Sequence, residues 1–398
     1  MMAQTLNFNI STELRSDLKH WRTRSGIAGT FGALFSAIGF FVSPNQFFHS
    51  YLWAYIFVVG LTVGPLAWLM LQYVTGGAWG LVIRRSCEAA TRTLPLTVLM
   101  FLPILIGINN LYPWPHANLV ATDEVLKHKQ PYLNLPFFLI RAAIYFAGWG
   151  FLSWWFNRWS AREDREGHDA VHGKASMMAG PGLIFWGFSV TFMSIDWILS
   201  ADPKWFSTMF GLLFVAGQGL SSMAFLITLV VLLSHRRPMS DVVTQRHLHD
   251  LGKFMLTLVM VWAYFSFSQF LIIWSGNLPD EIPWYLTRMN NGWQFVALIL
   301  VFGHFALPFA LLLSRDLKRN FKLLASIAVF VLGMRAVDVF WVVAPYFSKH
   351  LTVSWMDFTV PLGLIGLWLT YFLTQLEKRP LMPPNAPHLE EALEHGRE

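Results

Sequence analysis

The stretch from Gly180 to Gly211 carries the residues whose types and spacing most suggest chemistry. Its sequence, GPGLIFWGFSVTFMSIDWILSADPKWFSTMFG, reads as an apolar helix, a short hairpin and the start of a second apolar helix. Asp196 lies inside the first helix, and Asp202 lies in the turn beside Pro203. An acid inside a membrane-length helix costs roughly 2.5–3.5 kcal/mol on insertion scales, so it is usually retained to bind a ligand or pass a proton. The alternative is a structural hydrogen bond to a neighbouring helix.

Further polar residues interrupt other apolar segments of the chain. Arg335 and Asp338 are three residues apart, a helical spacing that places both side chains on one face, where they can pair. We estimated the depth of each group in the membrane from its position in its span and the α-helical rise per residue. Most of the groups lie in the outer half of the membrane, so the sequence predicts a polar site there. The candidates for proton transfer or quinone binding are Asp196, Asp202, Arg141, Gln269, His304, Arg335 and Asp338.

Several candidates also have a purely structural interpretation. Arg335 and Asp338 can simply neutralise one another between helices. A single buried histidine such as His304 is more often a hydrogen-bonded core residue than a ligand. Gln269 can make an ordinary interhelical hydrogen bond.

The elements that must position these side chains are membrane helices. The chain has 398 residues, of which 55% are hydrophobic and only 13% are charged, whereas soluble domains average about 25% charged residues. This composition indicates an all-α polytopic membrane protein with about ten transmembrane helices. The predicted spans are 25–42, 50–73, 93–110, 134–157, 180–200, 205–233, 252–275, 292–313, 322–344 and 355–375.

The basic residues predict the orientation of these ten spans. An even number of spans places both termini on the same side of the membrane. The N-terminus, the even-numbered loops and the tail hold 22 Lys and Arg when Lys253 and Lys322, at the adjoining ends of their spans, are counted with the loops. The odd-numbered loops hold five, and Arg141 and Arg335 lie deeper within spans, which accounts for all 29. This asymmetry predicts that both termini face the cytoplasm, and a net charge of +6 spread in this way does not suggest nucleic-acid binding.

The sequence also predicts the environment of three segments outside the spans. Residues 1–24 form a cytoplasmic N-terminal segment, within which 11–24 predict a short basic helix on the membrane surface. Four charged residues follow the glycine-rich turn GGAWG, namely Arg84, Arg85, Glu88 and Arg92. A solvated helix face at the membrane surface explains them as well as a functional polar site does. The proline-rich cytoplasmic tail, 376–398, is expected to be mobile or to lie along a neighbouring protein.

The metal-ligating residues are sparse. A b-type haem within the bilayer commonly needs two histidines, but of 13 histidines only His304 falls inside a predicted span. The single cysteine, Cys87, excludes an intrachain disulfide, an iron–sulfur cluster held by this chain alone and a CxxCH haem attachment. The sequence therefore predicts no redox metal in this chain.

Six stretches, running from about residue 76 to 345, resemble one protein family. They are GGAWGLVIRRSCE, LYPWPH, SIDWILSADPKWFSTMFG, MVWAYFSFSQFLIIWSGNLPDEIPWY, GHFALPF with LLLSRDLKRN, and MRAVDVFW. These motifs are similar to those of the ActF-type subunit of bacterial Alternative Complex III, within the wider NrfD/PsrC-like integral membrane proteins. The related ActC-type subunit is the alternative, and the seventh-span motif with the loop SGNLPDEIPWY favours ActF.

The resemblance implies two four-helix bundles, approximately 50–200 and 205–344, with one peripheral helix at each end of the chain. It also implies an inner-membrane complex that oxidises quinol, or menaquinol, and passes electrons to a periplasmic acceptor such as cytochrome c. Iron–sulfur clusters and c-type haems then belong to partner subunits, alongside an ActC-like paralogue. Such a chain is not catalytic alone and contributes a second quinone site or a proton route.

Quinol oxidation releases two protons with two electrons, so a site needs a group that accepts a proton, such as a buried carboxylate or a histidine. In this hypothesis Asp196, His304 and Asp338 relay protons, and Arg335 sets the charge state of Asp338. In a second form of this hypothesis, the same residues form hydrogen bonds with the headgroup of a quinone. The rival hypotheses are a secondary solute transporter, which buried charges and Gly/Pro-interrupted helices also fit, and a structural membrane anchor.

Overall fold

The computed structural model describes residues 8–167 and 172–385, and no strand occurs within these ranges. The long helices are α1 (Thr12–Val42), α2 (Pro44–Thr75), α3 (Ala78–Thr91), α9 (Leu135–Glu166), α11 (Ala179–Trp197), α12 (Met209–Leu233), α13 (Gln245–Gly276), α18 (Phe321–Val343) and α19 (Met356–Leu376). The short helices are α4 (Leu94–Leu99), α5 (Leu102–Ile106), α6 (Ile108–Leu111), α7 (Ala117–Thr122), α8 (Glu124–Lys129), α10 (His172–Met177), α14 (Pro283–Arg288), α15 (Trp293–Ile299), α16 (Leu307–Leu313) and α17 (Arg315–Arg319). Single turns of 3₁₀-helix span Leu199–Ala201, Met239–Asp241 and Ala344–Tyr346, and a π-helix spans Leu300–Ala306.

Ten helices within the described residues are long and apolar enough to cross a membrane. Some are assembled from consecutive pieces, such as α3–α5 and the run from α15 through the π-helix to α16. A segment that crosses lipid must satisfy its backbone hydrogen bonds internally, and an α-helix does so. The structure is therefore that of an all-α polytopic membrane protein, as the composition predicted.

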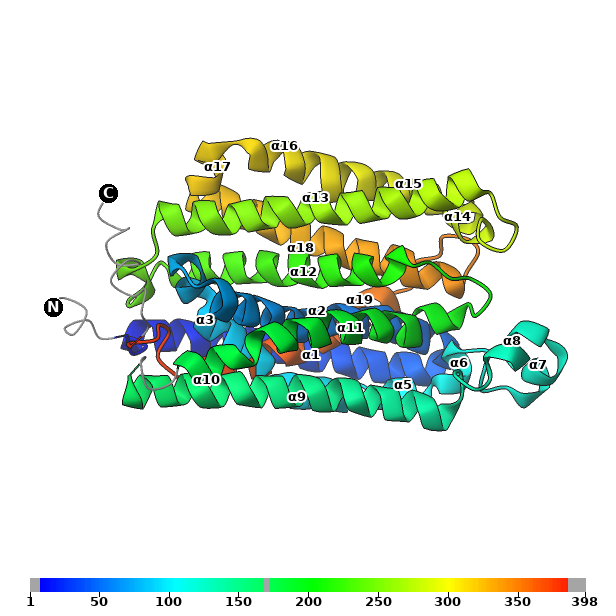
Figure 1. The fold of residues 1–398 in the computed structure, drawn as a ribbon, viewed down its shortest axis with the longest axis horizontal. Coiled ribbons are helices and arrows are strands. Elements are labelled where there is room, and N and C mark those ends of the chain that lie inside the picture. Colours follow the sequence, from blue (N-terminus) through cyan, green and yellow to red (C-terminus); the bar gives the residue numbers. More distant parts are fainter. Residues whose placement is uncertain (1–7, 168–171, 386–398) are drawn as a thin grey trace.

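The helices lie roughly parallel along the long axis of the molecule (Figure 1). α2, α3–α5, α9 and α11 pack into one four-helix bundle, and α12, α13, α15–α16 and α18 pack into a second. The two ends of the molecule differ. α1 begins and α19 ends at one end, called here the terminal end, while α6–α8 and α14 lie at the opposite hairpin end (Figure 1).

The two bundles meet where α2 packs against α12. Gly64 of α2 lies so close to α12 that a Cβ atom there would be 2.6 Å from the Gln218 carbonyl oxygen and 2.7 Å from Ser222 Oγ. The Trp68 indole N–H of α2 donates to Ser222 Oγ and to the Gly219 carbonyl, each at 3.1 Å. Small residues at a membrane helix contact allow the backbones to approach, and here they join the bundles.

The first and last membrane helices pack tightly against each other. At Gly29 of α1, a Cβ atom would lie 2.6 Å from the backbone nitrogen of Leu367 in α19, and at Gly366 it would meet the Gly29 backbone. The helices peripheral to the bundles therefore form a pair.

The expectation of a separate surface helix over 11–24 is wrong. α1 runs without a break from Thr12 through the first predicted span. Ser11 caps its N-terminus, with Ser11 Oγ accepting a hydrogen bond from the Leu14 amide at 3.2 Å. No glycine with positive φ or proline interrupts the helix between the basic segment and the apolar segment, so helix formation continues across both.

The third membrane helix begins well before its predicted start at residue 93. α2 ends at Thr75, and the next two residues, Gly76 and Gly77, have φ angles of +67° and +94°. α3 begins immediately afterwards at Ala78. Pro95 and Pro103 each lie in the first turn of a new short helix, where a missing N–H is tolerated. The span therefore continues to Ile106 as three consecutive helices, α3, α4 and α5.

The first part of the C-terminal tail packs on its own chain. Leu381 and Met382 are buried, and the Leu381 amide donates to the Phe8 carbonyl at 3.2 Å. Glu377 pairs with Arg22 of α1 at 2.8 Å. The expectation of a mobile tail is wrong for residues 377–385, which pack on their own chain, and 386–398 lie outside the described residues.

Candidate functional site

Asp196 is held by three side chains from the segment that leads into and forms α9. Its Oδ2 accepts hydrogen bonds from Arg141 Nε at 2.9 Å and from the Tyr145 hydroxyl at 2.6 Å. Its Oδ1 accepts from the Tyr132 hydroxyl at 2.9 Å. Burial and the neighbouring Asp196 charge raise the pKa of Tyr132, which lies outside the spans, so its hydroxyl stays a donor at neutral pH. Both carboxylate oxygens of this buried ion pair therefore accept hydrogen bonds, while Arg141 Nη2 has no partner among the described residues.

Asp338 occupies a second site, in the other bundle. Arg335 and Asp338 form an ion pair along α18, which confirms the pairing that their spacing predicted. The Trp262 indole N–H of α13 donates to Asp338 Oδ2 at 2.9 Å. The Arg335 guanidinium covers Gly217 of α12, where a Cβ atom would collide with it. Three helices therefore converge on this pair.

His304 lies beside this site on the π-helical turn of the eighth span. The side chain is fully buried, and its ring lies edge-on to Trp262 with 4.3 Å between the centroids. Neither ring nitrogen has a hydrogen-bond partner in the described part of the chain. Pro308, four residues on, has no N–H to donate to the His304 carbonyl, which gives a local reason for the wider π-helical turn. Unpartnered buried polar atoms in a π-helix are typical of functional positions.

Within the described residues, Gln269 and Asp202 form no hydrogen bond or ion pair with either Asp196 or Asp338. Gln269 Oε1 accepts from Ser207 Oγ at 2.9 Å, and Gln269 Nε2 donates to the Tyr285 hydroxyl at 3.3 Å. Asp202 is partly buried in the loop before α12. These hydrogen bonds divide the candidates among separate groups in the two bundles, rather than the single polar site expected.

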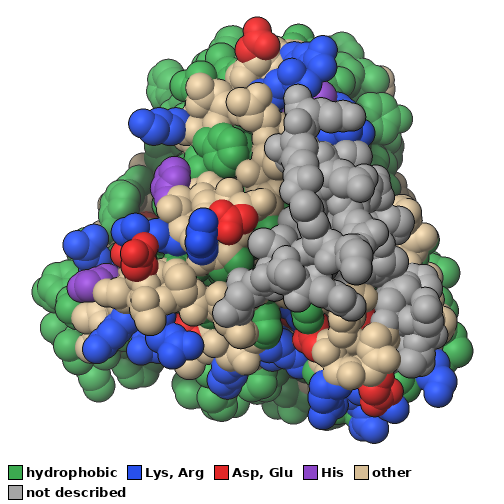
Figure 2. Space-filling model, turned by 90° about the vertical axis from the view of Figure 1, so that its left-hand side faces the viewer, with side chains coloured by type: hydrophobic (Ala, Val, Ile, Leu, Met, Phe, Trp, Pro, Cys, Tyr) green, Lys and Arg blue, Asp and Glu red, His purple; other side chains and the backbone are tan. Residues whose placement is uncertain are grey.

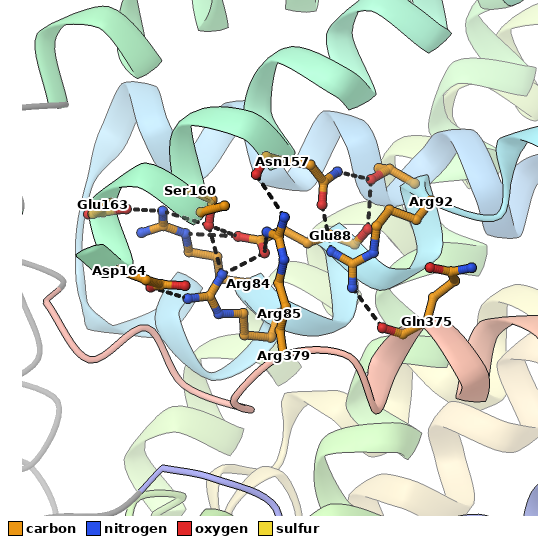
Figure 3. Close-up of polar contacts among 12 residues, drawn as sticks. Arg84, Arg85, Glu88, Arg92, Asn157, Ser160, Glu163, Asp164, Gln375 and Arg379 are labelled. Carbon is orange, nitrogen blue, oxygen red and sulfur yellow. Dashed lines mark hydrogen bonds and ion pairs between the residues drawn. The ribbon is translucent and has the colours of Figure 1, made fainter. Parts of the chain in front are cut away.

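A buried ionic network fills the terminal end of the first bundle (Figure 3). Glu88 lies at its centre and accepts from Ser160 Oγ at 2.6 Å, from Arg85 Nη1 at 2.8 Å and from Arg379 Nη1 at 3.1 Å. Arg84 pairs with Glu88 as well. The network also contains two acids near the end of α9, since Glu163 pairs with Arg84 and Asp164 pairs with Arg85.

The solvated face proposed for this segment is therefore wrong for three of its four residues. Arg84, Arg85 and Glu88 are at most 3% exposed. Arg92 is partly buried and donates to Asn157 Oδ1 at 2.6 Å and to the Gln375 carbonyl at 2.8 Å. A cluster of charged residues after a turn suggested exposure to solvent. Instead, acids on α9 pair with Arg84 and Arg85, and Arg379 from the tail pairs with Glu88.

Sequence reasoning missed two sets of polar residues. The first comprises Tyr132 and Tyr145, and the spacing of Arg141 and Tyr145 by one helical turn was the available signal. The second is centred on Asp357, a buried acid in the first turn of α19. Asp357 accepts from Ser50 Oγ at 2.7 Å, from Trp53 Nε1 at 3.3 Å and from the Ser354 amide at 2.9 Å.

No group of three or more His, Cys, Asp and Glu side chains within the described ranges is placed to hold a metal ion. Cys87 is buried and forms no disulfide. No protein-family model matches the chain, and no curated protein matches it significantly.

Proposed function

We propose that this chain is a membrane subunit of a quinol:acceptor oxidoreductase of the Alternative Complex III kind, and that it contributes a proton route through its second bundle. The observation that carries the proposal is the buried Arg335–Asp338 pair beside His304, whose two ring nitrogens have no partner among the described residues. A neutral imidazole has one donor and one acceptor, so His304 can receive a proton on one side and release one on the other.

The proposed roles follow from the chemistry of each group. Quinol oxidation releases protons, and a buried carboxylate can accept one when its countercharge is fixed. Arg335 is that fixed charge for Asp338, and Trp262 orients the carboxylate through its indole N–H. In the alternative form of the proposal, the same groups hydrogen-bond the headgroup of a quinone or menaquinone. Iron–sulfur and haem cofactors belong to partner subunits in either form.

The proposed location is a cytoplasmic membrane with both termini inside. The Lys and Arg residues support this orientation because most of them lie at the terminal end. Figure 2 shows this end, with basic side chains spread over the face and along its rim. The positive-inside rule relates such an excess to the cytoplasmic side.

The test of the proton route is the substitution Asp338→Asn in the assembled complex. We expect slower proton release during quinol oxidation with normal assembly, because Asn keeps the acceptor for Trp262 but cannot take up a proton. The matched control is Asp250→Asn, a partly buried acid on the same helix as Trp262 that pairs with Lys253 at 3.0 Å. Normal turnover together with normal proton release in Asp338→Asn would refute the relay.

A structural membrane anchor is the second candidate, and the Asp196 site favours it. Both Asp196 oxygens already accept direct hydrogen bonds, and Arg141 supplies the countercharge. A carboxylate whose two oxygens are both paired suits helix attachment better than proton transfer. If the anchor interpretation is correct for the whole chain, Asp196→Asn and Asp338→Asn should alter assembly of the complex and leave the proton yield per turnover unchanged.

A further inference from the structure

One face of α9 presents aromatic and basic side chains in a continuous row towards the terminal end. The positions recur at three- and four-residue intervals, which places them on the same side of the helix. Ring contacts connect the row, with centroid separations of 5.8 Å between Phe151 and Trp155 and 5.8 Å between Trp155 and Trp159. Phe151 is 45% exposed and Trp154 is 51% exposed, although both lie in a membrane-spanning helix. This face is therefore open to lipid.

Cations lie over these rings at the end of the row. The Arg158 guanidinium is 5.1 Å from the Trp154 ring centroid, and Lys174 Nζ of α10 is 5.5 Å from that of Trp159. Arg162 also lies over Trp159, but it is neutralised by Glu166 at 3.0 Å. Arg158 and Lys174 are exposed, and neither has an ion-pair partner among residues 8–167 and 172–385.

We propose that this face binds the headgroup and one chain of an anionic phospholipid such as phosphatidylglycerol. Arg158 and Lys174 would receive the phosphate, and Phe151 and Trp154 would contact the adjoining hydrocarbon. Three other cations near the site, Arg84, Arg85 and Arg162, already pair with acids. Basic residues at the cytoplasmic membrane boundary attract anionic lipid, and an indole orients a stacked cation.

The position along the helix supports a lipid over a soluble ligand. Trp154 lies three turns of helix before Glu166, where α9 ends, and Arg158 lies two turns before it. The cations thus sit at the boundary between the apolar span and the polar end, with exposed aromatic rings on the side of the membrane interior. A phosphate that is covalently attached to acyl chains satisfies both halves of this surface.

The experiment measures lipid retention by the purified full-length chain with native mass spectrometry, from micelles that contain equal amounts of phosphatidylglycerol and phosphatidylcholine. We expect phosphatidylglycerol to be retained about tenfold more than phosphatidylcholine. The double variant Arg158→Gln/Lys174→Gln should lose most of this preference. The matched control is Arg315→Gln/Lys322→Gln, which removes two exposed cations at the same end of the molecule and should keep the preference.

A second variant tests the aromatic half of the site. Trp154→Leu keeps an apolar side chain but removes the ring beneath Arg158, and should lower phosphatidylglycerol retention about two- to fivefold. Equal retention of the two lipids by the unaltered chain would overturn the proposal. An equal loss in the control double variant would also overturn it, because the effect would then be general surface charge. Displacement of the lipid by excess inorganic phosphate would assign the cations to a free anion instead.

Discussion

At the scale of single residues, the ionic network around Glu88 shows how charges persist inside the bundle. Glu88 is fully buried and contacts three guanidinium groups, from Arg84, Arg85 and Arg379. Removing one partner from a buried ion pair lowers the free energy of unfolding by more than the intact pair contributes to it, because the remaining charge stays desolvated without a partner. The network is therefore sensitive to loss of its central acid.

The substitution Glu88→Gln should lower the free energy of unfolding by about 3–5 kcal/mol, since it leaves an excess of buried positive charge. Thermal unfolding of the purified chain in detergent measures this effect. Glu166→Gln is the matched control, because Glu166 forms an exposed pair with Arg162 one turn apart on α9. It should change stability by less than about 0.5 kcal/mol. Equal effects of the two substitutions would contradict the buried network.

An exposed ion pair at the hairpin end gives a pH-dependent prediction. Lys204 Nζ lies 2.8 Å from Asp123 Oδ2, and its hydrogen bond lowers the pKa of Asp123 while the pKa of Lys204 is raised. A carboxylate with a lowered folded pKa stabilises above its unfolded pKa of about 3.9, and this stabilisation is lost as the pH falls through the folded value. A lysine with a raised folded pKa stabilises below its unfolded pKa of about 10.4, and this stabilisation is lost as the pH rises through the folded value.

Amide hydrogen exchange in α7 and α8, corrected for intrinsic rates, should therefore be slow between about pH 5 and pH 9 and faster below about pH 4. Asp123→Asn should show the low-pH exchange already at pH 6. The comparison isolates the ion pair because an Asn side chain can still accept the capping hydrogen bonds that Asp123 receives from the Val125 and Leu126 amides. An Asp123→Asn chain with unaltered exchange at pH 6 would show that the ion pair does not fix this hairpin.

At the scale of helices, the contact between α1 and α19 depends on backbone approach. The Gly29→Ala substitution places a Cβ atom against the α19 backbone, which cannot move aside as a flexible side chain can. We expect destabilisation of about 1–3 kcal/mol from overpacking, measured as a lower midpoint of thermal unfolding.

The matched control for this contact is Gly26→Ala, one turn earlier on the same helix. Its new Cβ would lie 3.6 Å from Thr370 Oγ1, an ordinary van der Waals distance. Without a clash, the higher helix propensity of Ala should leave stability unchanged or raised by up to about 1 kcal/mol. If Gly29→Ala is tolerated as well as Gly26→Ala, the two helices are not in direct backbone contact.

At the scale of the whole molecule, the membrane orientation is open to a direct test. Arg237 and Lys204 have side chains that are 80% and 64% exposed. Arg237 belongs to the loop between α12 and α13 at the terminal end, and Lys204 to the loop between α11 and α12 at the hairpin end (Figure 1). In intact cells, a membrane-impermeant maleimide should label Lys204→Cys, and should label Arg237→Cys only after permeabilisation. Cys87 is buried and should give no background. The reverse labelling pattern would invert the proposed topology.

The sequence by itself determined the ten membrane helices and the Arg335–Asp338 pair, because hydrophobic length and one-turn spacing are local properties of the chain. Only the tertiary structure decided which residues meet across helices. Asp196 pairs with Arg141, 55 residues away, and Glu88 receives Arg379 from the far end of the chain. Such contacts depend on how each helix is rotated and packed against its neighbours. The same reason explains why a segment that looks like a solvated surface is buried once acids from another helix and a cation from the tail complete its network.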